Sequence, residues 1–439
     1  MKVSDYVNSF LKKNEVKFIF EMSGGMITHL LDSIYQKNEI KIVSMKHEQS
    51  AAFAADTVGR LTGRPGIAMA TSGPGATNLI TGIGSSYFDS SPTMFITGQV
   101  NRNELKKNRK IRQLGFQETD IVSIIKPITK KAFRANNAKN VPNLLKKAYE
   151  ISVSGRPGPV LLDLPMDIQR TQIKMPKVKK VSIKSKKFYN KNLLKKLLFD
   201  LQNSKKPIVL VGGGIHSSCS LDLFREFIQL IKIPVVNSLM AVDALSYYDP
   251  LRVGFIGSYG NRWANITLSN SDFVLVLGSR LDVRQTGSQV KEFKGNKTIY
   301  HVDCEKGEIN NRISGCEVVN STLQSFLTSI IKYIGKKEFQ TRKDWINEIN
   351  SLKNLFPDYK ENSKISGINP NNFIHKLSKF SKKASVFVAD VGQHQMWAAQ
   401  SLELCKNQRF ITSGGMGSMG FGLPASIGAA FTKSPSPIV

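Results

Sequence analysis

One carboxylate, Glu48, stands at the head of an alanine-rich segment and is the first residue whose setting suggests chemistry. Apolar residues between Ala51 and Leu61 recur at helical spacing, which predicts a helix that ends at the glycine- and proline-rich turn 63–66. If this helix is buried, desolvation raises the pKa of Glu48 and favours a proton shared with a ligand. Alternatively, Glu48 only interacts with the positive end of the helix dipole.

The second feature is the glycine turn Gly73-Pro74-Gly75, which separates a predicted strand at 67–71 from a predicted helix at 76–88. Another strand is expected at 93–97, so the segment is a βαβ unit and predicts a parallel sheet. Backbone N–H groups at this turn could hold the polar groups of a ligand at the start of the helix. The turn could equally be only a tight connection.

Composition limits the classes of protein that these residues could belong to. The formal net charge is +29, which raises the question of nucleic acid, but the excess is mostly lysine and no nucleic-acid-binding motif accompanies it. The densest run has ten lysines and no acid between Lys174 and Lys196. Solvated surface lysines, or attraction of anionic substrates, explain the charge, and no nucleic-acid partner is expected.

Hydropathy and cysteine usage point to an ordinary cytoplasmic protein. No run of 18 apolar residues is present, so no membrane span is expected, and the first 20 residues lack the apolar stretch of a signal peptide. The four cysteines, Cys219, Cys304, Cys316 and Cys405, show no CxxC spacing. We therefore expect buried, reduced thiols rather than disulfides or a zinc site.

The length of 439 residues suggests about three domains. We place them at residues 1–170, 193–335 and 369–439, joined by a lysine-rich linker at about 171–190 and a polar connection before 369. Within the first domain, residues 101–115 are basic and polar and read as a loop near a site.

The middle domain contains several predicted strands that end in glycine, arginine or aspartate. Pro207 to Val211 is followed by three glycines, which is not the GxGxxG fingerprint and excludes a Rossmann dinucleotide motif. The strand at 272–277 leads to Arg280, and the strand at 298–303 ends in an acid. These residues would line the carboxyl edge of a parallel sheet, where nucleotides bind. Ordinary loop chemistry is the alternative.

A family resemblance is carried by residues 46–78, KHEQSAAFAADTVGRLTGRPGIAMATSGPGATN. This segment resembles the pyrimidine-binding domain of thiamine-diphosphate-dependent enzymes, above all the large catalytic subunit of acetolactate synthase and acetolactate-synthase-like proteins. The resemblance continues in order through SGRPGPVLLDLPMDIQ, VGQHQMWAAQ and SGGMGSMGFGLPASIGAA. Collinear motifs are far more specific than one glycine motif. The implied α/β fold has three doubly wound parallel-sheet domains: pyrimidine-binding, middle, and an incomplete diphosphate-binding domain.

The resemblance implies a carboligase that decarboxylates a 2-oxo acid such as pyruvate and joins the product to a second carbonyl. Glu48 would bind ring nitrogen N1′ of thiamine diphosphate and drive the tautomer that removes the C2 proton. Phe116 and Gln117 would face the substrate, with an exposed loop pair as the alternative. Further cofactor contacts would be Gly24, Gly25, Pro74, Asn78, Gly392, Gln393, His394, Met396, Gly417 and Met419. A capping histidine and core methionines are the alternatives there.

In acetolactate synthases the middle domain holds FAD, and the matching residues are Arg156, Gly212, Gly213, Gly214, Leu239, Met240, Arg280 and Asp303. Two segments depart from the synthase pattern: GSYG stands in place of GMHG, and GSRLDVR in place of GVRFDDR. Because related enzymes have lost FAD or bind another nucleotide, both outcomes stay open.

The resemblance also implies a metal ion, partner subunits and a substrate class. The family holds Mg²⁺ through a Gly-Asp-Gly strand and a later Asn, both beyond Val439, so no metal ligand is predicted here and a fragment or inactive remnant is expected. The cofactor would lie between subunits of a homodimer or homotetramer, with a small regulatory subunit as a further partner. Glu21 to Gly25 replace the YPGG turn, and Met166 replaces a lysine. A specialised carboligase or another 2-oxo acid decarboxylase is therefore the alternative.

Overall fold

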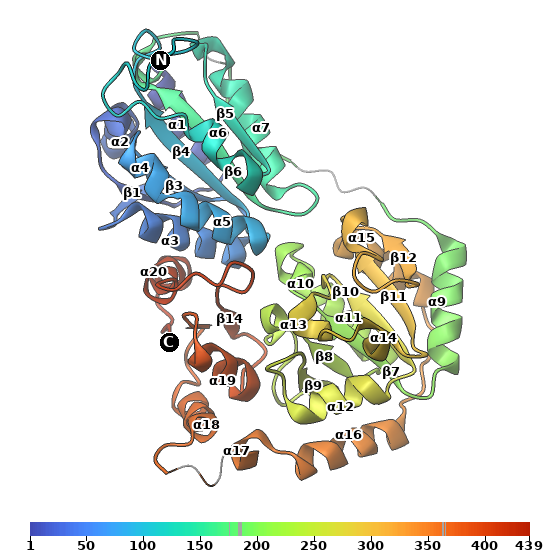
Figure 1. Cartoon of the computed structure of the whole chain (residues 1–439). Helices are drawn as coiled ribbons and strands as arrows, with labels where there is room; N and C mark the ends of the chain where they lie inside the picture. Colours follow the sequence, from blue (N-terminus) through green and yellow to red (C-terminus); the bar gives the residue numbers. More distant parts are fainter. Residues whose placement is uncertain (175, 183–186, 362–363, 365) are drawn as a thin grey trace. The chain divides into compact units, whose positions relative to one another are not determined.

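The computed structural model describes residues 1–174, 176–182, 187–361, 364 and 366–439. The chain forms two compact units (Figure 1). The first comprises residues 1–184 and 413–435, and the second comprises residues 185–412 and 436–439. The lysine-rich linker expected at 171–190 lies partly outside the described residues. The domain boundaries placed from the sequence stay predictions.

The first unit is built on a six-stranded parallel sheet with the order β2-β1-β3-β4-β6-β5. Its strands are β1 (Phe18–Met22), β2 (Lys41–Ser44), β3 (Gly66–Ala70), β4 (Thr93–Gln99), β5 (Lys131–Arg134) and β6 (Pro159–Pro165). The βαβ unit predicted around the Gly73 turn is confirmed, with β3 paired directly to β4. The helix expected at 76–88 is divided into α4 (Pro74–Asn78) and α5 (Ile80–Phe88).

Both faces of this sheet are buried, which explains the continuous apolar runs of its central strands. Ile67 and Met69 of β3 face one core, while Ala68 and Ala70 face the other. The first core is covered by α1 (Val3–Lys13), α2 (Thr28–Lys37), α7 (Val141–Val153) and α8 (Met166–Arg170). The second is covered by α3 (Glu48–Thr62), α4, α5 and α6 (Ile121–Ile125). Three short 3₁₀ turns, η1 (Gly25–Ile27), η2 (Lys126–Ile128) and η3 (Ala138–Asn140), complete the unit.

Helix α20 (Gly422–Lys433) packs against α3 in the same unit, although it comes from the end of the chain (Figure 1). The crossing is close, because a Cβ at Gly428 would lie 2.3 Å from the carbonyl oxygen of Ala54. Phe431 adds an aromatic contact to Phe20 of β1, with ring centroids 6.0 Å apart. Alanines on α3 and glycines on α20 thus let the two helix backbones approach each other.

The second unit contains another six-stranded parallel sheet, with the order β12-β11-β10-β7-β8-β9. Its strands are β7 (Pro207–Val211), β8 (Val235–Asn237), β9 (Arg252–Phe255), β10 (Phe273–Leu277), β11 (Thr298–Asp303) and β12 (Glu317–Asn320). One face is covered by α9 (Lys191–Asn203), α11 (Leu221–Ile231) and α15 (Leu323–Ile334), the other by α12 (Arg262–Asn270) and α16 (Lys343–Leu355). Short helices follow the strands: α10 (Gly214–Ser217), η4 (Leu239–Ala241), α13 (Val283–Thr286), α14 (Val290–Lys294) and η5 (Lys306–Glu308). The α/β class with parallel sheets is therefore confirmed.

The last part of the second unit is a small parallel sheet of β13 (Val386–Val388) and β14 (Arg409–Ile411). Residues 436–439 pair with the free side of β13 through an isolated bridge at Ile438. Helices α17 (Asp358–Glu361), α18 (Pro370–Phe380) and α19 (Gln393–Ser401) accompany this sheet. Its core includes Val242 and Phe255 of the six-stranded sheet region, so both sheets share one apolar cluster.

The four cysteines are free thiols, but their predicted burial was wrong for three of the four. Only Cys316 is buried, whereas Cys304 is half-buried and Cys219 and Cys405 are exposed. Burial raises the pKa of the Cys316 thiol.

Candidate active site

Glu48 is the first residue of α3 and follows the short connection after β2 (Lys41–Ser44), at the carboxyl edge of the first sheet. His47 precedes it as the N-cap residue, and its Nδ1 accepts a hydrogen bond from the backbone N–H of Gln49 at 3.1 Å. The Glu48 residue is only 6% exposed. The start of an apolar helix therefore holds a carboxylate in a nearly dry position.

Asn78 lies against Glu48, which brings together two residues that the resemblance assigned to the cofactor. The Asn78 amide Nδ2 donates a hydrogen bond to Glu48 Oε2 at 2.9 Å. On the other side, a Cβ at Gly75 would lie 3.1 Å from Glu48 Oε1. A larger residue at position 75 would crowd the Glu48 carboxylate. Glycine in the turn between β3 and α4 therefore keeps the space beside Oε1 open.

Thr71, at the end of β3, connects this turn to the predicted contacts at Gly24 and Gly25. Its Oγ1 accepts a hydrogen bond from the backbone N–H of Met26 at 3.2 Å. Its methyl group also lies beside Gly75, 2.8 Å from where a Cβ would stand. Thr71 was missed by the sequence reasoning, and its position immediately before the glycine turn was the only available signal.

The predicted substrate pair lies at the edge of the same region. Gln117 has a φ of +64° and lies against Gly73. A Cβ added at Gly73 would be 2.9 Å from the Cβ of Gln117. Phe116 is 80% exposed. Pro74 is also exposed. The side chains around Glu48 thus form an open edge of the sheet onto which the loop 101–118 returns.

The glycine-rich segment 413–420, which carries Gly417 and Met419, is anchored in the first unit by Asp89. The carboxylate of Asp89 accepts hydrogen bonds from the backbone N–H groups of Gly414 at 3.1 Å and Gly415 at 2.6 Å. Ser413 Oγ accepts another from the N–H of Ser418 at 3.1 Å. Met419 remains 78% exposed, so it does not have the core position that was its alternative.

Arg60 links Asp89 to α3 through a buried ion-pair network. Its guanidinium contacts Asp56 at 2.6 Å and Asp89 at 2.8 Å, and it lies over the ring of Phe421. Burial raises the pKa of Asp56 despite the opposing charge of Arg60. Burial lowers the pKa of Arg60, but the two carboxylates outweigh this and raise it, so the guanidinium stays charged. These three residues were not predicted, although Asp56 and Arg60 show i,i+4 spacing.

The predicted diphosphate contacts lie in the second unit, at the start of α19. Gly392 is the N-cap residue, and Gln393 and His394 form the exposed first turn of the helix. The side chains of Gln393 and His394 therefore lie on the helix itself. Met396 is half-buried and packs against the shared apolar cluster. Backbone N–H groups at such an N-terminus favour anionic ligands.

The residues matched to FAD contacts follow the carboxyl ends of four neighbouring strands of the second sheet. The glycine turn after β7 meets the end of β10, since the N–H of Gly214 donates to the carbonyl of Gly278 at 3.0 Å. Arg280 lies half-exposed after β10 and is 3.4 Å from Asp282. Asp303, at the end of β11, accepts a hydrogen bond from the N–H of Glu305. Leu239 and Met240 form η4, after β8.

Arg156 is the exception, because it lies in the first unit. Its Nε donates to Ser90 Oγ at 2.7 Å.

Within the described ranges, no group of three or more His, Cys, Asp or Glu residues is placed to hold a metal ion. No helix in the described part of the chain is long and apolar enough to span a membrane.

Comparison with known proteins defines the class. Residues 1–124, 194–330 and 390–439 match the N-terminal TPP binding domain, the central domain and the C-terminal TPP binding domain of thiamine pyrophosphate enzymes. These three matches follow the order of that class along the chain.

The relatives narrow the class further. The chain is 34% identical over 433 residues to the acetolactate synthase large subunit of Lactococcus lactis, covering 98% of this chain and 74% of that protein. It is 36% identical over 434 residues to the large subunit of Cyanidium caldarium, covering 95% and 72%. It is 34% identical to the isozyme 3 large subunit of Escherichia coli, covering 97% and 74%. The chain belongs to the thiamine pyrophosphate enzyme family, among relatives of the acetolactate synthase large subunit.

Proposed function

We propose that this chain is a thiamine-diphosphate-dependent carboligase that decarboxylates a 2-oxo acid such as pyruvate and joins the remaining unit to a second carbonyl. The observation that carries the proposal is the buried carboxylate of Glu48, held by Asn78 and faced by Gly75. The relatives named as acetolactate synthases support the same reaction class.

The residues around Glu48 fit the aminopyrimidine ring of the cofactor. When bound, thiamine diphosphate supplies the carbanion and the electron sink. Asn78 fixes one carboxylate oxygen of Glu48, and the open space at Gly75 leaves the other oxygen accessible. Glu48 then holds a proton shared with the ring nitrogen, and its burial keeps water from competing for that proton.

The remaining assignments extend this proposal to the other parts of the chain. Gly392, Gln393 and His394 would bind the diphosphate, with Mg²⁺ as its companion ion, and Met396, Gly417 and Met419 would contact the rings. Phe116 and Gln117 would face the 2-oxo acid. The strand ends around Arg280 would bind FAD, because a guanidinium fork suits a phosphate. We further propose a cytoplasmic homodimer or homotetramer that associates with a small regulatory subunit in branched-chain amino acid biosynthesis.

The substitution Glu48→Gln tests the proposal, because it keeps the shape of the side chain and removes its charge. We expect hydrogen–deuterium exchange at C2 of bound thiamine diphosphate, followed by NMR, to slow by about 10²–10⁴-fold, the range of general acid–base contributions. Glu150→Gln on the outer face of α7 is the matched control and should leave exchange unchanged. Exchange at the parent rate in Glu48→Gln would remove this residue from the mechanism.

A further inference from the structure

A buried carboxylate in the first unit, Asp163 of β6, has no role in the reaction described so far. Its side chain is 0% exposed. The register of the sheet places Thr97 of β4 beside it on one side and Arg134 of β5 on the other. Thr97 Oγ1 donates a hydrogen bond to one carboxylate oxygen at 2.8 Å, and Arg134 Nε donates to the other at 2.9 Å. Three neighbouring strands therefore meet at one carboxylate.

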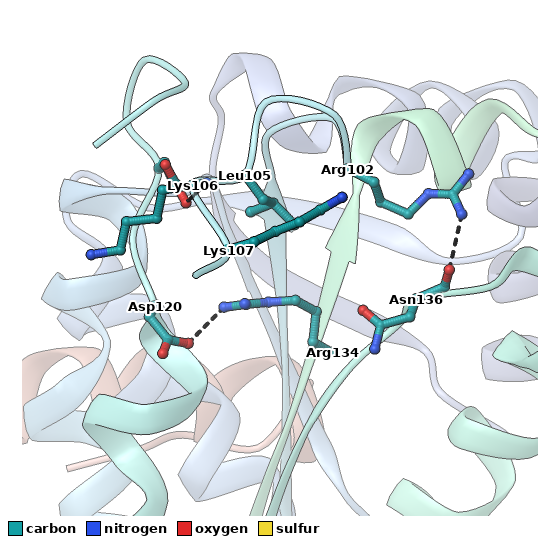
Figure 2. A pocket seen from close by; sticks show the side chains of 8 residues that line it. Arg102, Leu105, Lys106, Lys107, Asp120, Arg134 and Asn136 are labelled. Atoms are coloured by element: carbon teal, nitrogen blue, oxygen red, sulfur yellow. Dashed lines mark hydrogen bonds and ion pairs between the residues drawn. The ribbon is translucent and has the colours of Figure 1, made fainter. Parts of the chain in front are cut away.

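Arg134 makes the first connection from Asp163 to the loop after β4. Its Nη2 donates to Asp120 Oδ1 at 2.7 Å, and both residues line the pocket drawn in Figure 2. Burial lowers the pKa of Arg134, but the two carboxylates outweigh this effect and raise it. Burial raises the pKa of Asp163, although the charge of Arg134 opposes this. Because the guanidinium stays charged and uses two of its nitrogens, it forms a rigid bridge between the two acids.

Gln99 makes the second connection. It lies two residues after Thr97, so its side chain is on the same face of the sheet, and it is only 1% exposed. Its Nε2 donates both to Asp163 at 3.2 Å and to the backbone carbonyl of Thr119 at 2.8 Å. Its Oε1 accepts a hydrogen bond from the N–H of Val100 at 3.0 Å. Since both ends of the amide are engaged, the orientation of this side chain is fixed.

The two connections end on adjacent residues, Thr119 and Asp120, which close the segment that carries the predicted substrate pair 116–117. Asp120 is also the N-cap residue of α6. Gln117 lies against Gly73, beside the turn that faces Glu48. An anchor at 119–120 therefore limits how far residues 116–117 can move from the Glu48 edge of the sheet.

Glu118 lies within the same segment but acts differently. Its carboxylate accepts hydrogen bonds from the backbone N–H groups of Lys106 at 2.6 Å and Leu114 at 2.8 Å, so it shapes the loop from within. Phe116 is 80% exposed, and its own packing does little to fix it. The network that starts at Asp163 instead ties the end of the loop to the strands of the sheet.

We propose that Asp163 is a positioning residue that holds Phe116 and Gln117 in place for the 2-oxo acid. It acts through two connections, one made by Gln99 and one made by Arg134. The inference rests on the proposed function, which assigns the substrate to that pair. Groups that position a substrate must be held by hydrogen bonds behind them, because a displacement of about 1 Å can cost about 10²-fold in rate.

Kinetics of two variants with pyruvate test the proposal. Asp163→Asn keeps the shape of the side chain and removes its charge. Arg134→Met removes the bridge to Asp120 at a side chain that is 24% exposed, so its fold is less at risk. We expect the KM for pyruvate to rise about tenfold or more in both variants. Hydrogen–deuterium exchange at C2 of bound thiamine diphosphate should stay within about twofold of the parent rate, because Glu48 is not displaced.

Lys130→Met is the matched control. Lys130 is a half-buried cation four residues before Arg134, but its Nζ donates to the carbonyl oxygens of Ile151 and Ser154, at 2.5 Å and 2.6 Å. It therefore holds the end of α7 and not the segment 116–120. This substitution should leave both the KM for pyruvate and C2 exchange unchanged.

Backbone hydrogen–deuterium exchange of the ligand-free chain, followed by mass spectrometry, tests the anchor without the reaction. Peptides that cover residues 115–125 should exchange faster in Asp163→Asn and Arg134→Met than in the parent and in Lys130→Met. Unchanged backbone exchange there, or an unchanged KM for pyruvate in either variant while C2 exchange is intact, would overturn this inference alone. A parent chain without C2 exchange would contradict the proposed function itself, and this inference with it.

Discussion

The ion-pair network of Asp56, Arg60 and Asp89 predicts a large, local loss of stability when its cation is removed. Arg60→Met keeps much of the side-chain volume but leaves two carboxylates buried, since the side chains of Asp56 and Asp89 are 0% and 2% exposed. Removal of one partner from a buried pair costs about 3–5 kcal/mol. We expect a loss in this range for the first unit at neutral pH.

A residue just beyond α3, which ends at Thr62, provides a control with the opposite burial. Arg64, four residues later, pairs with Glu15, but these two side chains are 49% and 42% exposed. An exposed pair contributes about 0–1 kcal/mol, so Arg64→Met should be almost neutral. The comparison separates the loss of a buried counterion from the loss of an arginine at this end of α3.

Hydrogen–deuterium exchange by mass spectrometry is the suitable assay, because it reports local opening in a chain of two units where a single melting temperature is ill defined. Peptides from α3, α20 and the segment 413–420 should exchange faster in Arg60→Met, while β7 and β10 remain unchanged. The effect should shrink at acidic pH, where the buried carboxylates can take up protons. A change equal to that of Arg64→Met would show that Arg60 does not hold the glycine-rich segment in place.

Two further predictions concern pH. Burial raises the pKa of Glu21 despite the hydrogen bond from Ser44, so its contribution to stability is full below its ordinary pKa and is lost as pH rises through the folded value. Glu21→Gln should therefore stabilise the first unit at pH 8 and have no effect at pH 4. Urea unfolding at both pH values checks this, and an equal effect at both would contradict it. Burial lowers the pKa of His375, but Asp358 and Glu403 outweigh this and raise it. His375→Gln should destabilise the second unit more at pH 6 than at pH 9. An equal loss of α18 amide protection, relative to the parent chain, at both pH values would refute that role.

The central strands could be predicted because burial on both faces leaves a clear sequence signal. The strands β7 and β11 were predicted with the bounds that the structure has, and both contain almost only buried residues. The edge strands β5 and β12 were missed. Each is four residues long and mostly half-exposed or exposed, so its sequence lacks both the apolar run and a clean alternation.

For the candidate site, the sequence identified residues whose chemistry is local, and it missed those whose role depends on distant segments. Glu48 and the glycine turn were found because a carboxylate before an alanine-rich helix and a Gly-Pro-Gly turn are unusual at short range. The contact of Asn78 with Glu48 spans 30 residues, and the pairing of these two residues with the cofactor was inferred only from the resemblance.

Asp89 shows why the remaining part of the site could not be predicted. It binds backbone amides 325 and 326 residues away, on a segment whose own sequence consists mainly of glycine, serine and methionine. Such a segment has little apolar surface with which to fix its conformation, so its position depends on hydrogen bonds from elsewhere. Asp89 is in turn placed by Arg60, in the last turn of α3. The helix that presents Glu48 at its first residue therefore also holds, near its other end, the segment that carries Gly417 and Met419.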